Sequence, residues 1–118
     1  HLSPERYTIP LILTGGAVKD PQRITAYGSQ IDIAATLLAQ LGLPHDDFTF
    51  SKNILNPSSP HFAFFTFPNI FGMVTADNEV VFNCESNTVA MDEGTHQGEN
   101  LNKGKAYLQK LYDDLAKR

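Results

Sequence analysis

The sequence predicts an α/β arrangement, which as an isolated piece would be an α+β fold. Three observations support this. A short apolar run, IPLIL, precedes a long apolar segment with the period of a helix. Several short runs with a period of two residues follow, and a second segment with helical period closes the chain. The expected order is a buried strand, an apolar helix, a small antiparallel sheet and a C-terminal helix.

The run from Ile9 to Leu13 is the expected buried strand. An unbroken apolar run closed by Gly15 and Gly16 suits a strand that is covered on both faces, as in a parallel sheet. Phosphate-binding glycines also follow strands, but neither G-x-G-x-x-G nor G-x-x-x-x-G-K is present here. We therefore interpret the two glycines as a turn that ends the strand.

The segment from Ser29 to Leu41 carries the start and stop signals of a helix. Ser29 is a good N-cap, and Asp32 gives an acidic variant of the capping box. Gly42 suits the position after the last turn, and Pro44 prevents continuation. The helix is so apolar that it should be nearly surrounded by protein, which in 118 residues indicates a missing covering layer. Its apolar positions are Ile31, Ile33, Ala34, Ala35, Leu37, Leu38 and Leu41.

The second half of the chain predicts a sheet and a terminal helix. The runs HFAFFTF, FGMVT, EVVFN and TVAM indicate an antiparallel meander, with Asp77 and Asn78 at the tight turn between the second and third runs. Residues 103–118 form the expected helix, and Lys117 and Arg118 suit its C-terminal dipole. Its apolar face consists of Tyr107, Leu108, Leu111, Tyr112 and Leu115.

Composition excludes several classes of function. The net charge is −4 and the nine basic residues are scattered, so no nucleic-acid surface is expected. No apolar run approaches the roughly 20 residues that a membrane helix needs. The single cysteine, Cys84, rules out an internal disulfide and a cysteine-rich zinc site.

The histidines do not form a recognisable metal or catalytic motif. His45, followed by Asp46 and Asp47, could chelate a metal, but a solvated loop fits better. The same judgement applies to His96 beside Glu93. No catalytic, cofactor-binding or metal-binding residue is therefore expected in this chain.

Two further features have structural explanations that we prefer. Cys84 has no histidine near it in sequence, so a packed or half-exposed side chain is favoured over a nucleophile. The phenylalanine-rich stretch 62–71 could bind a ligand, but aromatic strands more often belong to a core.

Three segments resemble, in order, the C-terminal portion of sulfatases: RYTIPLILTGG, ITAYGSQIDIAATLLAQLGL and FTFSKNIL. The similarity is closest to the branch related to lipoteichoic acid synthases and phosphoethanolamine transferases, within the alkaline-phosphatase-like superfamily. Ile9-Pro10 matches the start of the family strand. The helix pattern S-Q-x-D-x-x-x-T-L-L-x-x-L-G is matched from Ser29 to Gly42, and residues 50–55 take the place of a segment like G-K-S-L-L.

The sequence also departs from the family pattern. Ala35 stands where the family usually has Pro, and Ser51 and Asn53 replace a usual Gly and Ser. These departures leave the fold expectation intact but do not identify the subfamily. Asp32 and Thr36 are expected to be structural, the first as a cap and the second in helix packing.

The resemblance implies that residues 1–118 are one C-terminal subdomain of a larger catalytic domain, here called the parent. Residues 1–44 would supply a strand and a helix of its central α/β layer, and residues 45–118 a small sheet and a terminal helix. The parent would hydrolyse or transfer sulfate or phosphate esters with a nucleophile upstream of this chain. That nucleophile would be activated by a divalent metal, Mn, Mg, Ca or Zn, and no cofactor is expected in the chain itself.

The resemblance also implies a location and one candidate site residue. The parent would be extracytoplasmic, periplasmic or at the cell surface, and bacterial; whether membrane helices precede it stays open. In the transferase branch a histidine ahead of the family strand faces the substrate anion, and His1, in HLSP, takes the matching place. A terminal residue without a role is the alternative for His1.

For the 118 residues alone, two expectations follow. The chain should be inactive, and its main partner would be the remainder of the parent. Because the surface that the parent covers would be open, the chain should self-associate. The alternative function is a free-standing binding or interaction module that uses the phenylalanine-rich sheet face.

Overall fold

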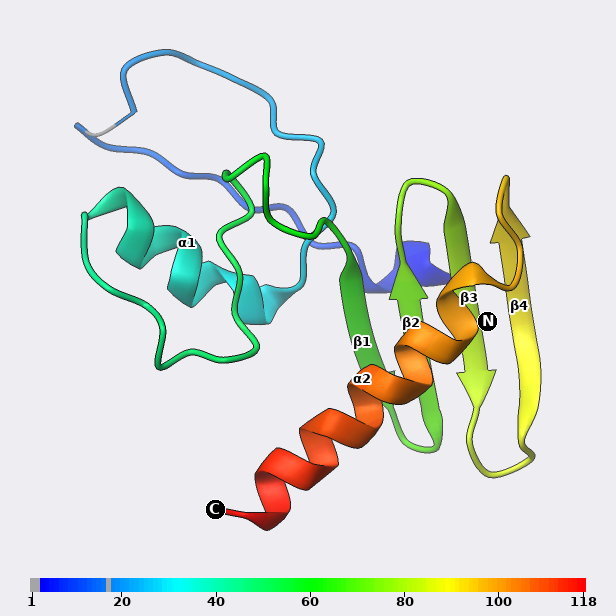
Figure 1. Cartoon of the computed structure of the whole chain (residues 1–118). Coiled ribbons are helices and arrows are strands. Elements are labelled where there is room, and N and C mark those ends of the chain that lie inside the picture. The colour runs from blue at the N-terminus through cyan, green and yellow to red at the C-terminus, as the bar shows by residue number, and fades with distance from the viewer. Residues whose placement is uncertain (1–2, 17) are drawn as a thin grey trace. The chain divides into compact units, whose positions relative to one another are not determined.

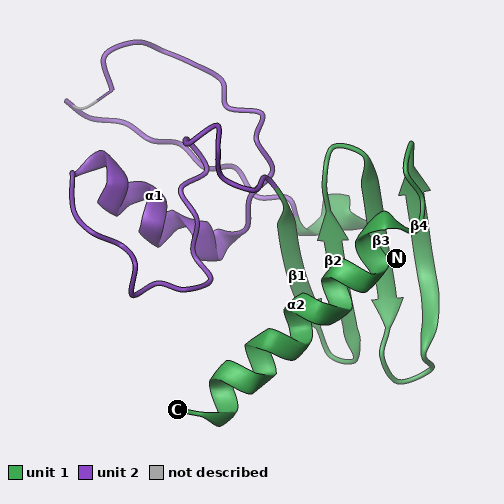
Figure 2. Ribbon diagram, in the orientation of Figure 1, with its two compact units in different colours: residues 1–7, 62–118 green, residues 8–61 purple. Residues whose placement is uncertain are grey.

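The structure is a computed structural model that describes residues 3–16 and 18–118. It divides into two compact units, which are considered separately (Figure 2). The described residues of unit 1 are 3–7 and 62–118, and unit 2 consists of residues 8–61. The expected division between residues 44 and 45 refers to layers of the parent and stays a prediction. The elements are η1 (Pro4–Tyr7), η2 (Gln30–Asp32), α1 (Ile33–Gln40), β1 (Ala63–Phe67), β2 (Ile70–Val74), β3 (Asn78–Asn83), β4 (Thr88–Gly94) and α2 (Glu99–Ala116) (Figure 1).

Unit 1 contains the four-stranded sheet that the alternating runs predict. The strand order is β1-β2-β3-β4 and every neighbouring pair is antiparallel, so the predicted meander is confirmed. The expected turn between β2 and β3 is also present: the Thr75 N–H donates to the Asn78 carbonyl at 2.9 Å. With a helix at each position where one was expected, the α+β class is confirmed.

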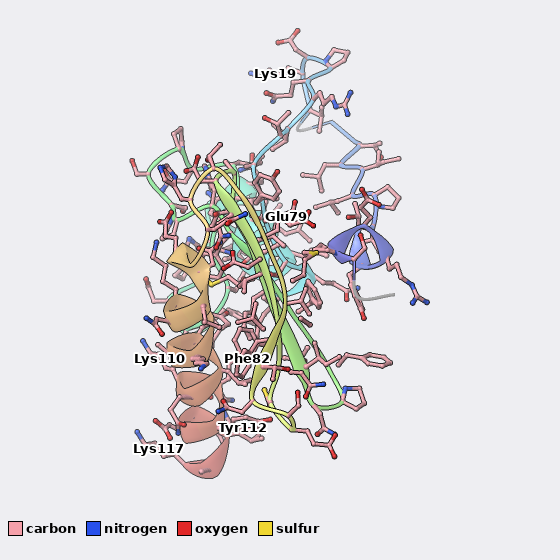
Figure 3. All side chains as sticks on the ribbon, turned by 90° about the vertical axis from the view of Figure 1, so that its right-hand side faces the viewer. Lys19, Glu79, Phe82, Lys110, Tyr112 and Lys117 are labelled. Carbon is pink, nitrogen blue, oxygen red and sulfur yellow. The ribbon has the colours of Figure 1, made fainter. Side chains whose placement is uncertain are left out.

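Helix α2 packs across β2 and β3 and covers one face of the sheet (Figure 1). The core between them contains Phe71 and Phe82, and Figure 3 shows Phe82 between α2 and the strands. Gly104 allows the close approach, because a side chain there would collide with the Phe71 ring. The Tyr107 ring packs against Phe64, with centroids 4.6 Å apart.

The predicted bounds and face of the last helix are only partly right. The helix begins at Glu99 rather than at residue 103, because the expected loop contains its first turn. Its buried positions are Asn100 and Gly104, whereas Tyr112 and Leu115 are 60% and 67% exposed. The last turns extend past the sheet in Figure 1, so the apolar side chains there have no strand beneath them.

The opposite face of the sheet holds a small aromatic contact. The Phe65 ring lies over Gly72, where a side chain would collide with it. The Tyr7 ring stacks on Phe65 with a centroid separation of 4.2 Å. This stack explains why η1, at the start of the chain, belongs to the same compact unit as the sheet.

In unit 2 the predicted helix is confirmed. A 3-10 turn, η2, leads directly into α1, and Leu41 closes the helix. Gly42 has φ of +68°, the left-handed conformation that its place after the helix predicts. Ala35 and Thr36 are fully buried, while Leu38 is only half-buried. Within the described part of the chain the helix is therefore only partly covered.

The predicted buried strand is wrong for this chain. Residues 9–13 form no strand, and Ile9, Leu11 and Ile12 are 58%, 45% and 79% exposed. Within the described residues between 8 and 28, the one backbone–backbone hydrogen bond runs from Val18 N to Gly15 O. A strand needs a neighbour for its N–H and C=O groups, and none of the described residues of unit 2 supplies one. The apolar run is thus present without the sheet that it predicts.

Candidate functional site

The candidate substrate-binding residue lies outside the described part of the chain. His1 is not among the described residues, so its role stays a prediction. The residues of the helix pattern and of segment 50–55 are all described, and polar residues of the two segments contact each other. They are therefore the place where the structure bears most directly on function.

Asp32 holds the start of the helix and the following loop segment together. Its Oδ2 accepts the N–H of Ser29 at 2.8 Å, as the predicted capping box requires. Its Oδ1 accepts the N–H of Lys52 at 3.0 Å, and the Lys52 ammonium donates to Oδ2 at 2.5 Å. The Asp32 side chain is 1% exposed and that of Lys52 is 13% exposed, so this ion pair is largely removed from water.

Two more contacts join the same segments. The Thr36 hydroxyl donates to the Asp32 carbonyl at 2.7 Å and accepts the N–H of Ile54 at 3.2 Å. The Ala35 N–H donates to Oγ of Ser51 at 2.9 Å. We call this group the motif clamp; it consists of Ser29, Asp32, Ala35, Thr36, Ser51, Lys52 and Ile54.

The motif clamp has the chemistry of a structural joint. Both oxygens of Asp32 are occupied by donors, and the Thr36 hydroxyl both donates and accepts. Neither group is presented to a substrate. The expected structural roles of Asp32 and Thr36 are therefore confirmed. Sequence reasoning missed the pairing of Asp32 with Lys52, although a carboxylate in so apolar a helix indicates that a cation lies nearby.

A second polar cluster lies in unit 1, where α2 begins against the β2–β3 turn. The Asn100 amide donates to Oγ1 of Thr75 at 2.9 Å and to the carbonyl of Asn78 at 2.6 Å. The Asn78 amide in turn donates to Oδ1 of Asp92 at 2.7 Å. Asn100 and Asn78 are buried, and Oδ1 of Asn100 has no partner among the described residues. This cluster fixes the first turn of α2 on the sheet.

The remaining charged side chains of this region are exposed. Nδ1 of His96 lies 3.8 Å from a carboxylate oxygen of Asp77 and 3.8 Å from one of Glu99. A hydrogen bond from Lys103 lowers the pKa of Glu99 below its ordinary value of 4.5, and the charges of Lys103 and His96 act in the same direction. In the part of the chain that the structure describes, no three His, Cys, Asp or Glu side chains gather as a metal site requires.

The other sequence candidates do not come together with these groups. Cys84 is exposed after β3, and its N–H donates to the Asn69 carbonyl at 2.7 Å. The phenylalanine-rich strand turns one face towards α2, where Phe62 and Phe64 pack against Tyr107. Phe62 and Phe64 are half-buried in this contact, and the alternative function, a binding module that uses the phenylalanine-rich face, stays a prediction.

Comparisons with known proteins identify no relative of this chain. No protein-family model, no curated protein and no solved structure matches this chain. Among the described helices, none is long and apolar enough to cross a membrane.

Proposed function

We propose that this chain is the C-terminal portion of a sulfatase-like enzyme that hydrolyses or transfers sulfate or phosphate esters. The observation that carries the proposal is a pair of contacting departures from the family pattern. Ala35 replaces a usual Pro, and Ser51 replaces a usual Gly. The Ala35 N–H and the Ser51 hydroxyl form a hydrogen bond with each other, at 2.9 Å.

The two departures compensate chemically. Proline has no N–H, so a chain with Pro at position 35 needs no acceptor there, and Gly at position 51 offers none. Alanine introduces a buried N–H near the start of α1, where intrahelical acceptors are missing. A serine hydroxyl at position 51 satisfies that N–H. Two substitutions 16 residues apart thus preserve one junction, which supports the match to the family pattern.

The other matched polar positions have roles at the same junction. Asp32 and Thr36 from the helix pattern contact Lys52 and Ile54 from the segment that takes the place of G-K-S-L-L. A junction of this kind explains in physical terms why the two patterns occur in one sequence. The proposed contribution of this chain to catalysis is therefore to hold a helix and a loop of the parent in a fixed arrangement.

The chemistry in the proposed parent comes from residues ahead of this chain. A metal ion there would activate the nucleophile and stabilise the anionic oxygens of the ester as it is attacked. The parent would be extracytoplasmic, and its substrate would carry a sulfate or phosphate group. The 118 residues would be inert without the nucleophile and the metal.

Two experiments test the proposal. The reading frame upstream should encode an early Thr, Cys or Ser nucleophile, and an Asp-His or Asp-Asn pair shortly before the IPLIL run. The purified 118-residue chain should not turn over aryl sulfate or aryl phosphate with any divalent metal, whereas the full reading frame should turn over one of them. An upstream frame without these residues, or metal-dependent turnover by the 118-residue chain, would refute the proposal.

A further inference from the structure

The segment from Thr8 to Thr14 presents an open and uncharged backbone edge. No backbone–backbone hydrogen bond occupies the N–H or C=O groups of these residues in the described structure. Three of its apolar side chains are among the exposed large hydrophobic residues of the chain: Ile9, Leu11 and Ile12. Along the sequence, the nearest charged residues on either side are Arg6 and Lys19. Unpaired edges of this kind are usually protected by charge, and here that protection is absent.

Pro10 determines which side of this segment can pair. In a strand, the N–H and C=O groups of successive residues point to opposite edges. Residues 9, 11 and 13 therefore share one edge and can all donate. Pro10 lies on the other edge and has no N–H, so that edge has a missing donor. A partner strand can therefore pair with the edge that carries the N–H and C=O groups of Ile9, Leu11 and Leu13.

The same edge is complementary to a second copy of itself. In an antiparallel pair centred on Leu11, that residue faces Leu11 of the other copy, and Ile9 faces Leu13. On the opposite face Thr8 meets Thr14, and Pro10 meets Ile12. Every opposed pair is apolar or Thr–Thr, and the proline is on the outer edge in both copies.

The sheet in unit 1 has two edge strands, β1 and β4, and β4 provides a contrast. Strand β4 is the last strand of the sheet and carries Asp92 and Glu93. Negative charges on both partners would oppose pairing through that edge. The apolar segment of unit 2 has no such charges, which favours it over β4 as the surface for self-association.

From these observations we propose that two copies of this chain associate through residues 8–14, paired as antiparallel strands about a twofold axis at Leu11. The edge of Ile9, Leu11 and Leu13 carries the hydrogen bonds. The proposal rests on the open backbone edge and on the position of Pro10, and it holds whether or not the parent is an enzyme.

A pair of proline variants tests this edge. Leu11→Pro removes an N–H from the pairing edge of each copy, whereas the matched control Ile12→Pro removes one from the outer edge. Light scattering over a range of concentrations should show a dimer for the unmodified chain. The dissociation constant should rise about tenfold or more for Leu11→Pro, because a symmetric pair loses two hydrogen bonds, and change little for Ile12→Pro.

A second measurement needs no variant. Amide hydrogen exchange on the unmodified chain should show protection of Leu11 and Leu13 that increases with protein concentration, while Ile12 exchanges freely. A chain that stays monomeric at all concentrations would overturn the proposal. An equal rise of the dissociation constant for Leu11→Pro and Ile12→Pro would also overturn it, as would protection of the Ile12 amide instead of the Leu11 amide. Circular dichroism should confirm that both variants retain their helices, which lie outside this segment.

Discussion

The compensating pair in the motif clamp can be tested with a double-mutant cycle. The cycle consists of Ser51→Gly, Ala35→Pro and the double variant, each measured by denaturant unfolding. Ser51→Gly removes the acceptor of the Ala35 N–H, and Ala35 is completely buried. Leaving a buried donor without a partner costs about 1–3 kcal/mol. In the Ala35→Pro background that N–H does not exist, so the same change should cost less.

The cycle removes effects that are unrelated to the hydrogen bond. Glycine at position 51 increases the freedom of the unfolded chain by about 0.5–1 kcal/mol, and it does so in both backgrounds. Proline at position 35 restricts the preceding residue in both of its variants. These terms cancel, and the remaining coupling energy should be favourable by about 1–2 kcal/mol.

A control cycle uses a serine of the same unit. Ser58 is exposed and its hydroxyl is not part of the motif clamp, so Ser58→Gly and Ala35→Pro should be additive within about 0.5 kcal/mol. If the cycle with Ser51→Gly were equally additive, the hydrogen bond would not explain the paired departures. The structural support for the family match would then be lost.

Three further predictions concern unit 1. Gly104→Ala should lower the free energy of unfolding by about 1–3 kcal/mol in denaturant melts, despite the better helix propensity of alanine, because the Phe71 ring occupies the space that the new side chain needs. The control Asn102→Ala, at an exposed position of the same helix, should leave the stability unchanged or raise it. A Gly104→Ala variant that is more stable than the unmodified chain would contradict the packing of α2 on Phe71. Asn100→Ala should cost about 1–3 kcal/mol, since the hydrogen bonds from its amide to Oγ1 of Thr75 and to the carbonyl of Asn78 are lost, and a loss below about 0.5 kcal/mol would show that water replaces the amide. The lowered pKa of Glu99 means that its contribution to stability is present above pH 4.5 and is lost as the pH falls through the folded-state value. Lys103→Met should raise this pKa in an NMR titration of the carboxyl group, and an unchanged titration would contradict the assigned cause.

Elements with strong local signals were predictable from the sequence. The helix of unit 2 begins at its serine cap and ends before Gly42, because capping and a left-handed glycine act within a few residues. The meander was predictable because a period of two residues reflects side chains that alternate between two faces. The start of α2 was not, since it depends on the burial of Asn100 against a turn 22 residues away.

The run from Ile9 to Leu13 shows the limit of pattern-based prediction. Five apolar residues indicate what a segment would do in a sheet, but a strand exists only where a neighbour accepts its hydrogen bonds. The candidate site shows a similar limit. The capping role of Asp32 was predictable from spacing, whereas its ion pair with Lys52 depends on how a loop folds back over 20 residues.

The stack of Tyr7 on Phe65 makes unit 2 an insertion within unit 1. The chain leaves unit 1 after Tyr7 and re-enters it at residue 62, so both ends of unit 2 are anchored to the same small fold. The two anchors differ greatly in strength. At the second, the chain runs directly into β1. At the first, the ring of Tyr7 in a single-turn helix contacts Phe65 and Phe67, and the geometry of each such pair contributes about 0.5–1.5 kcal/mol beyond area burial. Because the chain leaves unit 1 after Tyr7 and returns to it at residue 62, the contact of Tyr7 with Phe65 closes a loop of the chain that contains the whole of unit 2.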